Sequence, residues 1–477
     1  MNRLILFTIF ISSVMFFISC NNRMGNMGTT KSEYKFDNST FNKLAIPSIL
    51  EPTVIDGVNH YDLKIQKGVH SFFKDVETKT FGVNGGYLGP TLILKNGEKV
   101  SLDYTNLLGE PTTMHGHGMH VPAKMDGTPH QKIKSGDKWS AVYTVKQRAA
   151  TNWYHPHLMG KTAEHVYKGL AGLLIVEDDE INSLDIPKTY GVDDIPLVLQ
   201  DRFFDSKGQI NYSPSMMEIM HGYHGDIFIT NGVINAYIDL EAKEVRLRLL
   251  NGSNSTVYDL KFKDNRSFKQ IATDNSLLES PVTLNHVLLS PGERAEIIVD
   301  LTDLLGKSIS LIDSKTNNSF LKININKEVT KLTHTPDKLT KLDFYDIKNA
   351  TKQRDFVLSG SMGEFYINNR SMDMNYINEI VPLDKVEIWT AKNTMGMEHN
   401  FHIHATHFIV LERNGSKSNV LDNEKGYKDT VYLAPGDSVK LLVKMTDYAD
   451  PDTPYMYHCH FLEHEDNGMM GQFTVIK

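Results

Sequence analysis

The C-terminal region contains the stretch Tyr455-Met-Tyr-His-Cys-His-Phe-Leu-Glu-His-Glu-Asp-Asn-Gly-Met469, in which a cysteine lies between two histidines. Neighbouring side chains of an extended strand point to opposite faces, so we expect His458 and His460 to face one way and Cys459 the other. A thiolate with nearby imidazoles, followed ten residues later by a methionine, is typical of a trigonal copper site with a weak axial sulfur ligand. The two flanking histidines are left to bind a different metal centre behind the strand.

The simpler alternative is that these are ordinary surface or core histidines beside an ordinary free thiol. The choice depends on whether the rest of the chain supplies the missing ligands. Twenty histidines are present, and half of them fall inside four short motifs. Besides the stretch quoted above, the motifs are His115-Gly-His117, His155-Pro-His157 and His399-Asn-Phe-His402-Ile-His404. The chain therefore carries enough nitrogen donors for more than one metal centre.

The bulk composition is that of a soluble globular protein, with 40% hydrophobic and 23% charged residues. A length of 477 residues predicts about three domains, because single cores stop growing at roughly 250–300 residues. The net charge of -8 argues against nucleic acid or an anionic membrane surface as a partner. Only two cysteines occur, Cys20 and Cys459, so no disulfide framework is expected.

The N-terminus has the features of a secretory signal peptide over residues 1–20, with Arg3 followed by an apolar run. Phe17-Ile-Ser-Cys20 resembles a bacterial lipoprotein cleavage box, although Phe17 stands where leucine is usual. We therefore expect an exported protein, in the periplasm or the cell envelope, that reaches a membrane only through lipid on Cys20. Plain secretion is the alternative. Residues 21–44 are polar and small and predict a flexible tether.

From residue 45 onward short alternating runs dominate, which favours an all-β protein built of sandwiches or barrels. Two markers recur at intervals of roughly 150 residues, as expected for a repeated domain. The first marker is an alternating strand, in Asn96–Leu102, Glu241–Leu247 and Leu383–Ile388. The second is a turn before a strand, in Ser135-Gly-Asp137, Pro291-Gly-Glu293 and Pro435-Gly-Asp437. We therefore predict three similar domains, over residues 45–180, 181–345 and 346–477.

The histidine motifs are distributed unevenly over these predicted domains. Two lie in the first domain and two in the third, whereas the middle domain has no His-x-His, and His221 and His224 are predicted to be loop residues. Ligands at both ends of the chain imply that the first and third domains meet. The metal site should lie at their interface.

These motifs resemble those of the multicopper oxidases, in particular the three-domain bacterial copper-efflux oxidases, spore-coat laccases and bilirubin oxidases. The resemblance covers nearly the whole mature chain. The matching residues are Thr113–Gly118, Trp153–His157, Gly169-Leu-Ala-Gly172, His399–His404 and Tyr457–Met469. The resemblance implies three cupredoxin-like domains in what we expect to be a monomer, with four bound copper ions and O2 as the electron acceptor.

The resemblance also implies a ligand set, position by position. The type 1 copper would take His399, Cys459, His464 and the axial Met469. The type 2 copper would take His115 and His402, and the two type 3 coppers would share His117, His155, His157, His404, His458 and His460. Gly116 departs from the family, which usually has tryptophan between the first two ligands. The change removes bulk but no donor atom, so copper binding is expected to survive.

The resemblance further implies a four-electron reduction of O2 to water, with electrons passing from a surface reductant through Cys459 to the three-copper cluster. Protons must then reach a buried site. Asp126 and Glu465 occupy positions that resemble the proton-relay acids of the family. Their alternative interpretation is a turn aspartate and a surface glutamate.

The reductant is left open by the sequence. Met395 and Met397 lie just before His399, and thioethers select Cu(I), so they are candidate ligands for a cuprous substrate. The alternative is that these methionines fill gaps in the core, with a phenol or bilirubin as substrate. Two further alternatives concern the whole protein: a copper-storage protein, or a structural or division-associated relative of the same fold without turnover.

Overall fold

The computed structural model describes residues 30–329, 331–361 and 363–477, of which residues 32–477 form one compact unit. The predicted signal peptide, with Cys20, lies outside the described residues. In the described part there are thirty-two β-strands and four α-helices of five or six residues each, which confirms the all-β prediction. Within the same residues, no helix is long and apolar enough to cross a membrane.

The strands of residues 53–177 form two sheets. One contains β2 (Thr53–Ile55), β3 (Val58–His70), β6 (Lys99–Leu107) and β8 (Lys138–Thr144), with β4 (Thr78–Val83) paired to β3. The other has the order β5 (Leu92–Lys95), β10 (Gly172–Glu177), β9 (Ala150–His155) and β7 (His115–His117). Their buried faces share one hydrophobic cluster, which includes Leu63, Leu102 and Leu174.

A second pair of sheets is built mainly from residues 194–327. One sheet has the order β13 (Val233–Ile234), β12 (Ile227–Thr230), β11 (Asp194–Arg202), β15 (Glu244–Asn251), β20 (Arg294–Asp300), β17 (Phe268–Ala272) and β18 (Leu277–Leu284). The other has the order β1 (Asn42–Lys43), β14 (Ala236–Glu241), β22 (Ser319–Lys327), β21 (Lys307–Asp313), β16 (Tyr258–Phe262) and β19 (Val287–Leu289). A separate hydrophobic cluster fills this pair.

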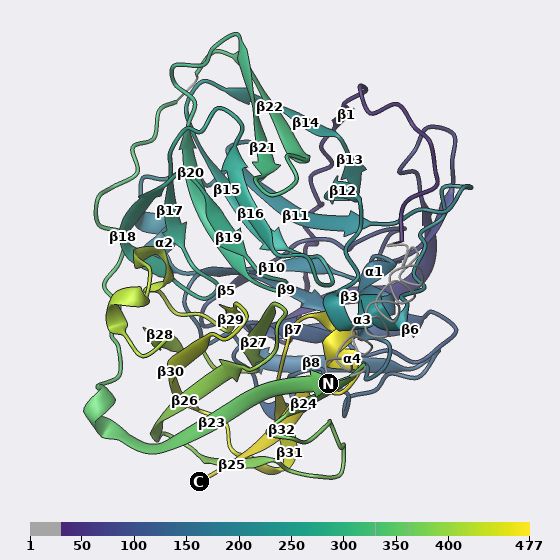
Figure 1. Cartoon of the computed structure of the whole chain (residues 1–477). Coiled ribbons are helices and arrows are strands. Elements are labelled where there is room, and N and C mark those ends of the chain that lie inside the picture. Colours follow the sequence, from purple (N-terminus) through teal and green to yellow (C-terminus); the bar gives the residue numbers. More distant parts are fainter. Residues whose placement is uncertain (1–29, 330, 362) are drawn as a thin grey trace, which may run out of the picture. The chain divides into compact units, whose positions relative to one another are not determined.

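The third pair of sheets uses residues 350–476. One sheet has the order β24 (Glu364–Ile367), β23 (Ala350–Ser361), β26 (Val386–Asn393), β30 (Ser438–Lys444) and β28 (Ile409–Arg413). The other has the order β25 (Glu379–Pro382), β32 (Met470–Ile476), β31 (Asp450–His458), β27 (His399–Ile403) and β29 (Thr430–Leu433). Figure 1 shows these strands in green and yellow, with the C-terminus at their edge.

One arrangement of three strands recurs in all three regions. A long strand pairs in parallel with the strand of the first sequence marker, in β3 with β6, β11 with β15 and β23 with β26. That strand pairs antiparallel with the one that follows the Gly-Asp or Gly-Glu turn, in β6 with β8, β15 with β20 and β26 with β30. Both sequence markers therefore correspond to one repeated structural unit.

Three of the short helices lie close together, as Figure 1 shows. They are α1 (Thr162–Tyr167), α3 (Met216–His221) and α4 (Leu462–Asp466), and α4 contacts both of the others. A capping box between Ser215 and Glu218 satisfies the free backbone groups at the start of α3. His221 is the last residue of α3, so its prediction as a loop residue is wrong.

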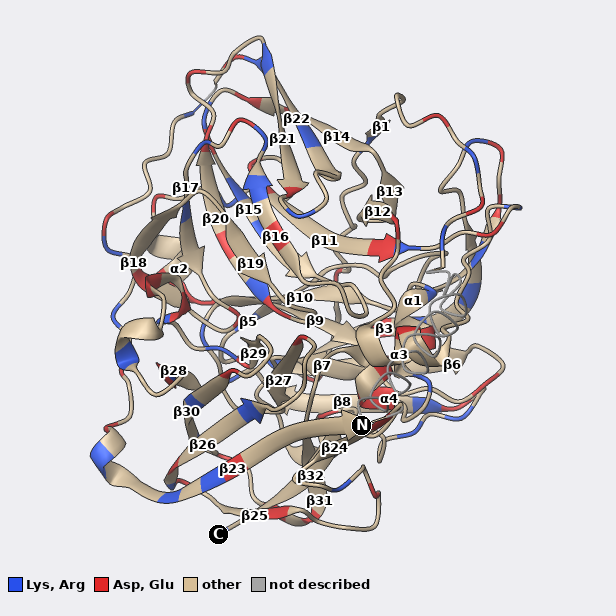
Figure 2. Cartoon of the chain, viewed as in Figure 1, with Lys and Arg blue, Asp and Glu red and all other residues tan. Residues whose placement is uncertain are grey.

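The remaining helices are short. They are α2 (Asp179–Ser183) and the 3-10 turns η1 (Ala123–Met125), η2 (Ile347–Asn349), η3 (Lys417–Asn419) and η4 (Asp422–Glu424). Charged residues of both signs are interspersed over strands and loops in the view of Figure 2.

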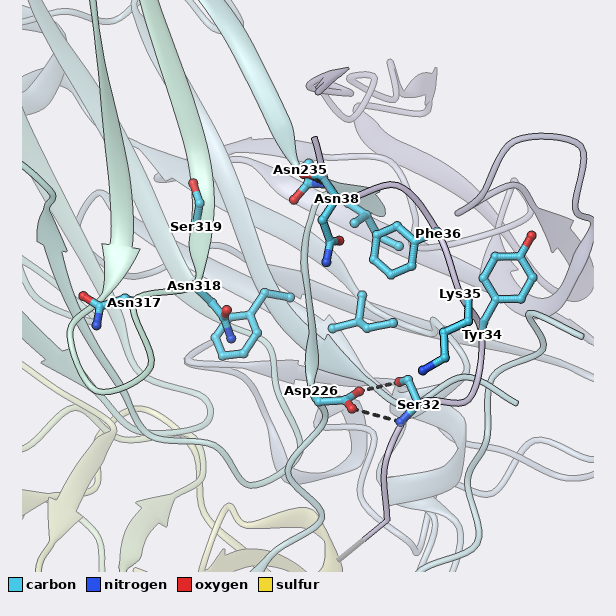
Figure 3. A pocket seen from close by; sticks show the side chains of 13 residues that line it. Ser32, Tyr34, Lys35, Phe36, Asn38, Asp226, Asn235, Asn317, Asn318 and Ser319 are labelled. Carbon is cyan, nitrogen blue, oxygen red and sulfur yellow. Dashed lines mark hydrogen bonds between the residues drawn. The ribbon is translucent and has the colours of Figure 1, made fainter. Parts of the chain in front are cut away.

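Residues 32–44, from the predicted tether, are held against the second pair of sheets. β1 pairs in parallel with β14, and the backbone N–H of Glu33 donates to the carbonyl of Phe204. Ser32 bonds the carboxylate of Asp226 through its backbone N–H, at 2.9 Å, and through its hydroxyl. These contacts border a cavity of about 440 Å³ that is lined by both polar and apolar side chains (Figure 3). None of the sequence-predicted site residues lines it.

Candidate metal centres

Strand pairing brings the histidine motifs together. In the antiparallel pair of β7 with β9, His115 lies opposite His155, and in the pair of β27 with β31, His402 lies opposite His458. β9 ends at His155, so only the first residue of the His155-Pro-His157 motif lies in a strand. His157 lies beyond the strand end, where its backbone N–H donates to the Thr113 hydroxyl at 2.7 Å.

All ten histidines of the four motifs are buried, with at most 1% of each side chain exposed. Neutral imidazole is the form that tolerates burial. Burial holds the pKa of most of these rings well below 6.5, and repulsion from neighbouring imidazoles lowers it further for several of them. Buried polar nitrogens need partners, so this concentration of them requires an explanation.

The first group joins His157, His404 and His458, from both ends of the chain. Their three Nε2 atoms lie 3.1–3.2 Å from one another. The Nδ1–H of His404 donates to the Asp126 carboxylate at 2.7 Å, and that of His458 donates to the Cys459 carbonyl at 3.0 Å. With their protons on Nδ1, these rings direct lone pairs at a common point. Such an arrangement is unfavourable unless a cation binds there.

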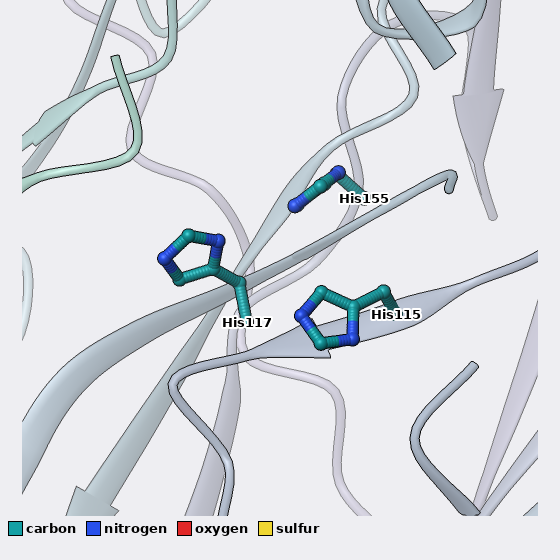
Figure 4. A group of neighbouring side chains, drawn as sticks. All are labelled: His115, His117 and His155. Atoms are coloured by element: carbon teal, nitrogen blue, oxygen red, sulfur yellow. The ribbon is translucent and has the colours of Figure 1, made fainter. Parts of the chain in front are cut away.

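The second group joins His117, His155 and His460, whose ring centroids lie 4.9–5.6 Å apart. The His155 Nδ1–H donates to the carbonyl of Pro156 at 2.8 Å, which leaves its Nε2 facing the Nε2 of His460 at 3.4 Å. Figure 4 shows His117 and His155 projecting beside His115 from neighbouring strands. The buried Nδ1 of His117 has no hydrogen-bond partner.

A third pair, His115 and His402, lies beside both groups. The Nδ1–H of His115 donates to the Asp126 carbonyl at 2.6 Å, and that of His402 donates to the Asp429 carbonyl at 2.9 Å. The Nε2 atoms of both rings are buried and have no partner. An outer hydrogen bond to carbonyl or carboxylate, with the inner nitrogen free, is the usual arrangement of metal-binding histidines.

Cys459 faces a separate site, and His458 and His460 face the two groups above. The Cys459 Sγ lies 3.4 Å from Nδ1 of His399 and 3.8 Å from Nδ1 of His464, and these nitrogens are 3.1 Å apart. Burial raises the pKa of the Cys459 thiol to about 12 and lowers that of His399 to about 3. A bound cation must therefore displace a proton from the thiol.

Met469 is held beside this site by the backbone. Its carbonyl accepts from the N–H of Cys459 at 3.1 Å, and its own N–H donates to the carbonyl of His464 at 2.9 Å. The Met469 side chain is fully buried in the same hydrophobic cluster as Cys459. Two nitrogens, a thiol and an adjacent thioether are the donor set of a blue-copper centre.

The two candidate relay acids are both buried, which rules out a surface glutamate at Glu465. Asp126 contacts His404 through its carboxylate and His115 through its carbonyl. The Glu465 oxygens lie 3.3 Å from Nδ1 of His157 and 3.2 Å from Nδ1 of His458. Burial, with the nearby carboxyl of Asp466, raises the pKa of Glu465 well above its usual range.

The methionine candidates differ in placement. The Met395 sulfur lies 3.2 Å from Nε2 of His399, on the outer side of the Cys459 site. Met397 contributes its carbonyl, which accepts from the side chain of Asn393 at 2.8 Å. Helix α3 also approaches this site, because the carbonyl of Met220 lies 3.3 Å from Nε2 of His464. Of the two methionine candidates, the half-buried Met395 is thus the one whose sulfur contacts His399.

Sequence reasoning missed three buried residues that bond to these histidines or to their bonding partners. The Asp429 carboxylate accepts from Nε2 of His117 at 2.9 Å, and Arg294 forms a bidentate pair with the same carboxylate. The Asn400 side chain accepts from the N–H of His460 at 2.5 Å. Asn400 lies inside a predicted motif, but Asp429 and Arg294 belong to none. Although burial alone raises it, the pKa of Asp429 is held well below its usual range by Arg294 and His117.

Known proteins similar to this chain include copper-dependent oxidases, as the donor sets described above would suggest. Models of the multicopper oxidase family match residues 64–181 and 335–477. The chain is 39% identical over 443 residues to a multicopper oxidase, mco, of Staphylococcus aureus, covering 91% of this chain and 93% of that protein. It is 35% identical over 452 residues to the cell division protein FtsP of Xenorhabdus nematophila, covering 91% of this chain and 92% of that protein.

Among solved structures, the chain is similar to a laccase from Pediococcus acidilactici. The two are 32% identical with a TM-score of 0.88, over 94% of this chain and 96% of that one. Matches of this extent at this identity, together with family models that cover both ligand-bearing regions, establish the relationship. The chain belongs to the multicopper oxidase family.

Proposed function

We propose that the protein is an oxidase that uses four copper ions to couple one-electron oxidation of a small reductant to the reduction of O2 to water. The observation that carries the proposal is the position of Cys459. Its thiol belongs to one donor set, and its two neighbours in sequence belong to two others. His458 lies in the group with His157 and His404, and His460 lies in the group with His117 and His155.

The donor sets assign the residues as follows. The type 1 ion would be held by His399, Cys459 and His464 with Met469, the type 2 ion by His115 and His402, and the two type 3 ions by the two groups of three histidines. Copper in these sites would supply one-electron redox chemistry and O2 binding. The chain itself provides a covalent connection of three consecutive residues from the Cys459 site to both type 3 groups.

Asp126 and Glu465 are proposed to deliver protons to the cluster. Asp126 bonds ligands from both copper-binding regions, and Glu465 lies between Nδ1 of His157 and Nδ1 of His458. Both carboxyl groups are buried, so a proton on them is shielded from bulk water. A carboxyl group at hydrogen-bond distance from the cluster ligands can pass a proton inward without rearrangement of the fold.

The proposed reductant is Cu(I), which would give the protein a role in copper tolerance. Its supporting observation is the soft Met395 sulfur, 3.2 Å from the outer nitrogen of His399. Met397 is proposed as a second ligand on sequence position alone. The alternative is a phenolic substrate, consistent with similarity to the laccase of Pediococcus acidilactici. Met372 packs in a separate cluster with Met456 and Met470, so we assign it to the core.

The test compares O2 uptake with Cu(I) and with 2,6-dimethoxyphenol for Met395→Leu, Met397→Leu and Met372→Leu. A cuprous oxidase predicts that Met395→Leu slows the Cu(I) reaction about 10-fold while phenol oxidation continues. Met372→Leu controls for loss of a methionine without loss of the site. Equal rates with Cu(I) in all variants would assign Met395 to packing and favour the laccase alternative.

A second candidate function is structural, in cell division, and it is favoured by the similarity to FtsP of Xenorhabdus nematophila. Copper storage is a third. The variant Cys459→Ser separates the structural role from the two copper-dependent roles, because a structural role needs the fold but no copper ligand. Rescue of a gene-deletion phenotype by Cys459→Ser would support the structural role. Failure of rescue, with the variant protein present at normal amounts, supports a copper-dependent role, and O2 uptake by the wild-type protein then distinguishes the oxidase from storage.

Export and lipidation remain part of the proposal. They rest on the apolar run in residues 1–20 and on Cys20 in the lipoprotein-like box. The expected result is incorporation of labelled palmitate in cells and its loss in Cys20→Ala. Labelled protein in the Cys20→Ala variant, or unlabelled wild type in the envelope fraction, would contradict lipidation at Cys20.

A further inference from the structure

The middle region of the chain, which supplies none of the proposed copper ligands, lies directly against them. The turn between β19 and β20 contains Gly292, and a Cβ atom there would lie 3.1 Å from the His460 ring and 3.2 Å from the His117 ring. Arg294 follows at the start of β20 and is at most 1% exposed. A buried guanidinium requires a compensating carboxylate.

That carboxylate is Asp429, which directly precedes β29. Arg294 donates from Nη1 to Oδ1 at 2.8 Å and from Nη2 to Oδ2 at 2.6 Å, a bidentate geometry that fixes the plane of the carboxylate. Asn275 donates to Oδ2 at 2.6 Å and Thr430 donates to Oδ1 at 2.8 Å. Four hydrogen bonds, from Arg294, Asn275 and Thr430, therefore hold the Asp429 carboxylate in addition to the one from His117.

The fixed carboxylate determines which nitrogen of His117 remains free. His117 donates from Nε2 to Oδ1 of Asp429 at 2.9 Å, which leaves its unpartnered Nδ1 as the metal-facing atom. His115 and His402 have the opposite orientation, with Nδ1 bonded to carbonyls and Nε2 free. The His402 ring stacks on the His117 ring with their centroids 3.8 Å apart, and the Nδ1–H of His402 donates to the backbone carbonyl of Asp429. One residue thus orients two ligands.

We propose that Arg294, acting through Asp429, is a positioning residue that commits His117 to bind copper through Nδ1 and fixes the His117–His402 pair. The inference rests on the proposed four-copper function. The middle region, although it supplies no proposed ligand, would then position two of the ligands through Arg294. Within residues 30–329, 331–361 and 363–477, Arg294 forms no hydrogen bond or ion pair with His399, Cys459 or His464. The blue colour of the type 1 site should therefore show whether a variant of Arg294 is folded.

The test uses the copper-loaded full chain with Arg294→Lys and Asp429→Asn. Lysine keeps the charge but cannot form the bidentate pair. The expected result is a normal blue band per chain, about 10- to 100-fold weaker binding of the remaining copper and an altered type 2 EPR signal. Arg246→Lys is the matched control, because Arg246 is equally buried in neighbouring β15 but pairs with Asp194 and Glu296.

Two outcomes would overturn the inference. Full copper content with an unchanged type 2 signal in both Arg294→Lys and Asp429→Asn would show that the pair does not position the ligands. Colourless Arg294→Lys and Asp429→Asn proteins, with blue Arg246→Lys, would show that the pair serves folding instead. If the wild-type protein itself binds no copper beyond the blue centre, the proposed function fails, and Arg294 is not the cause.

Discussion

The side chain of Cys459 belongs to the proposed type 1 site, whereas its neighbours in sequence, His458 and His460, belong to the two proposed type 3 groups. Replacing Cys459 with serine removes the sulfur donor but keeps nearly the same volume. We expect Cys459→Ser to fold, to lose the blue colour and to lose turnover, as measured by visible absorption, circular dichroism and O2 uptake. A variant that stays blue would contradict the type 1 assignment.

Glu465 lies against His157 and His458, two of the proposed type 3 ligands, whereas Glu463 bonds Ser255 and Asn254. The two buried carboxyl groups in the same helix therefore form a matched pair. We expect Glu465→Gln to keep all four coppers but to slow turnover about 100-fold or more, since it removes an acid group beside the cluster. Glu463→Gln should keep its rate. Equal rates for Glu465→Gln and wild type would remove Glu465 from the proton path.

At the scale of single residues, the sequence indicated candidate ligands where histidines repeat at short spacing. Period-two motifs identified His115 and His117, and the Cys459 segment indicated its own partners. Asp429 and Arg294 could not be found this way, because a single carboxylate and a single guanidinium have no local pattern. Their role depends on a contact between residues 135 positions apart, and only the fold creates it.

At the scale of elements, the Gly-Asp and Gly-Glu turns were predictable as repeats, but their different surroundings were not. Gly136 and Gly292 have nearly the same positive φ, +87° and +85°. A Cβ atom at Gly136 would meet nothing within 4 Å, whereas one at Gly292 would press on His117 and His460. The same turn therefore has open space around its glycine in the first region and packs against His117 and His460 in the second.

These turns give an element-scale prediction. Gly136→Ala and Gly292→Ala carry a similar backbone cost, of about 1–2 kcal/mol, because both glycines are left-handed. We expect only Gly292→Ala to weaken copper binding at the histidine cluster, by about 10-fold, with the blue band intact. Copper analysis and type 2 EPR provide the measurement. Equal copper content in the two variants would show that the cluster tolerates displacement of both rings.

At the scale of the whole molecule, burial of so many histidines makes stability depend on pH. Burial lowers the pKa of His165 and of His407 to about 4, and that of His399 to about 3. In the unfolded chain each ring has a pKa near 6.5. The unfolded state therefore binds more protons between about pH 4 and 6.5, so stability must fall as the pH falls through this range.

We expect the melting temperature of copper-free protein to decrease steadily from pH 7 to pH 5, as measured by calorimetry. Copper bound to the neutral imidazoles should raise the melting temperature at each pH. A melting temperature that is constant across this range would mean that the buried histidines do not titrate on unfolding, contrary to their environment.

The overall fold was predictable because the same strand pattern and turn recur three times, and because ligands at both chain ends required the ends to meet. His157 and His404 illustrate this, since they are separated by 247 positions and their Nε2 atoms lie 3.2 Å apart. The contribution of the middle region was not predictable, because its Arg294 reaches His117 only through Asp429 and is not itself a proposed ligand. Residues 32–44 were predicted to belong to a flexible tether, but this is wrong for the strand β1, which pairs with β14.

The central claim is that electrons taken up at the Cys459 site reduce O2 to water at the histidine cluster. The most direct measurement is the ratio of reductant oxidised to O2 consumed by the copper-loaded protein, with catalase added to reveal peroxide. Four electrons per O2, with no O2 released by catalase, is the predicted result. Two electrons per O2 with peroxide, or no uptake by protein that holds four coppers, would contradict the claim.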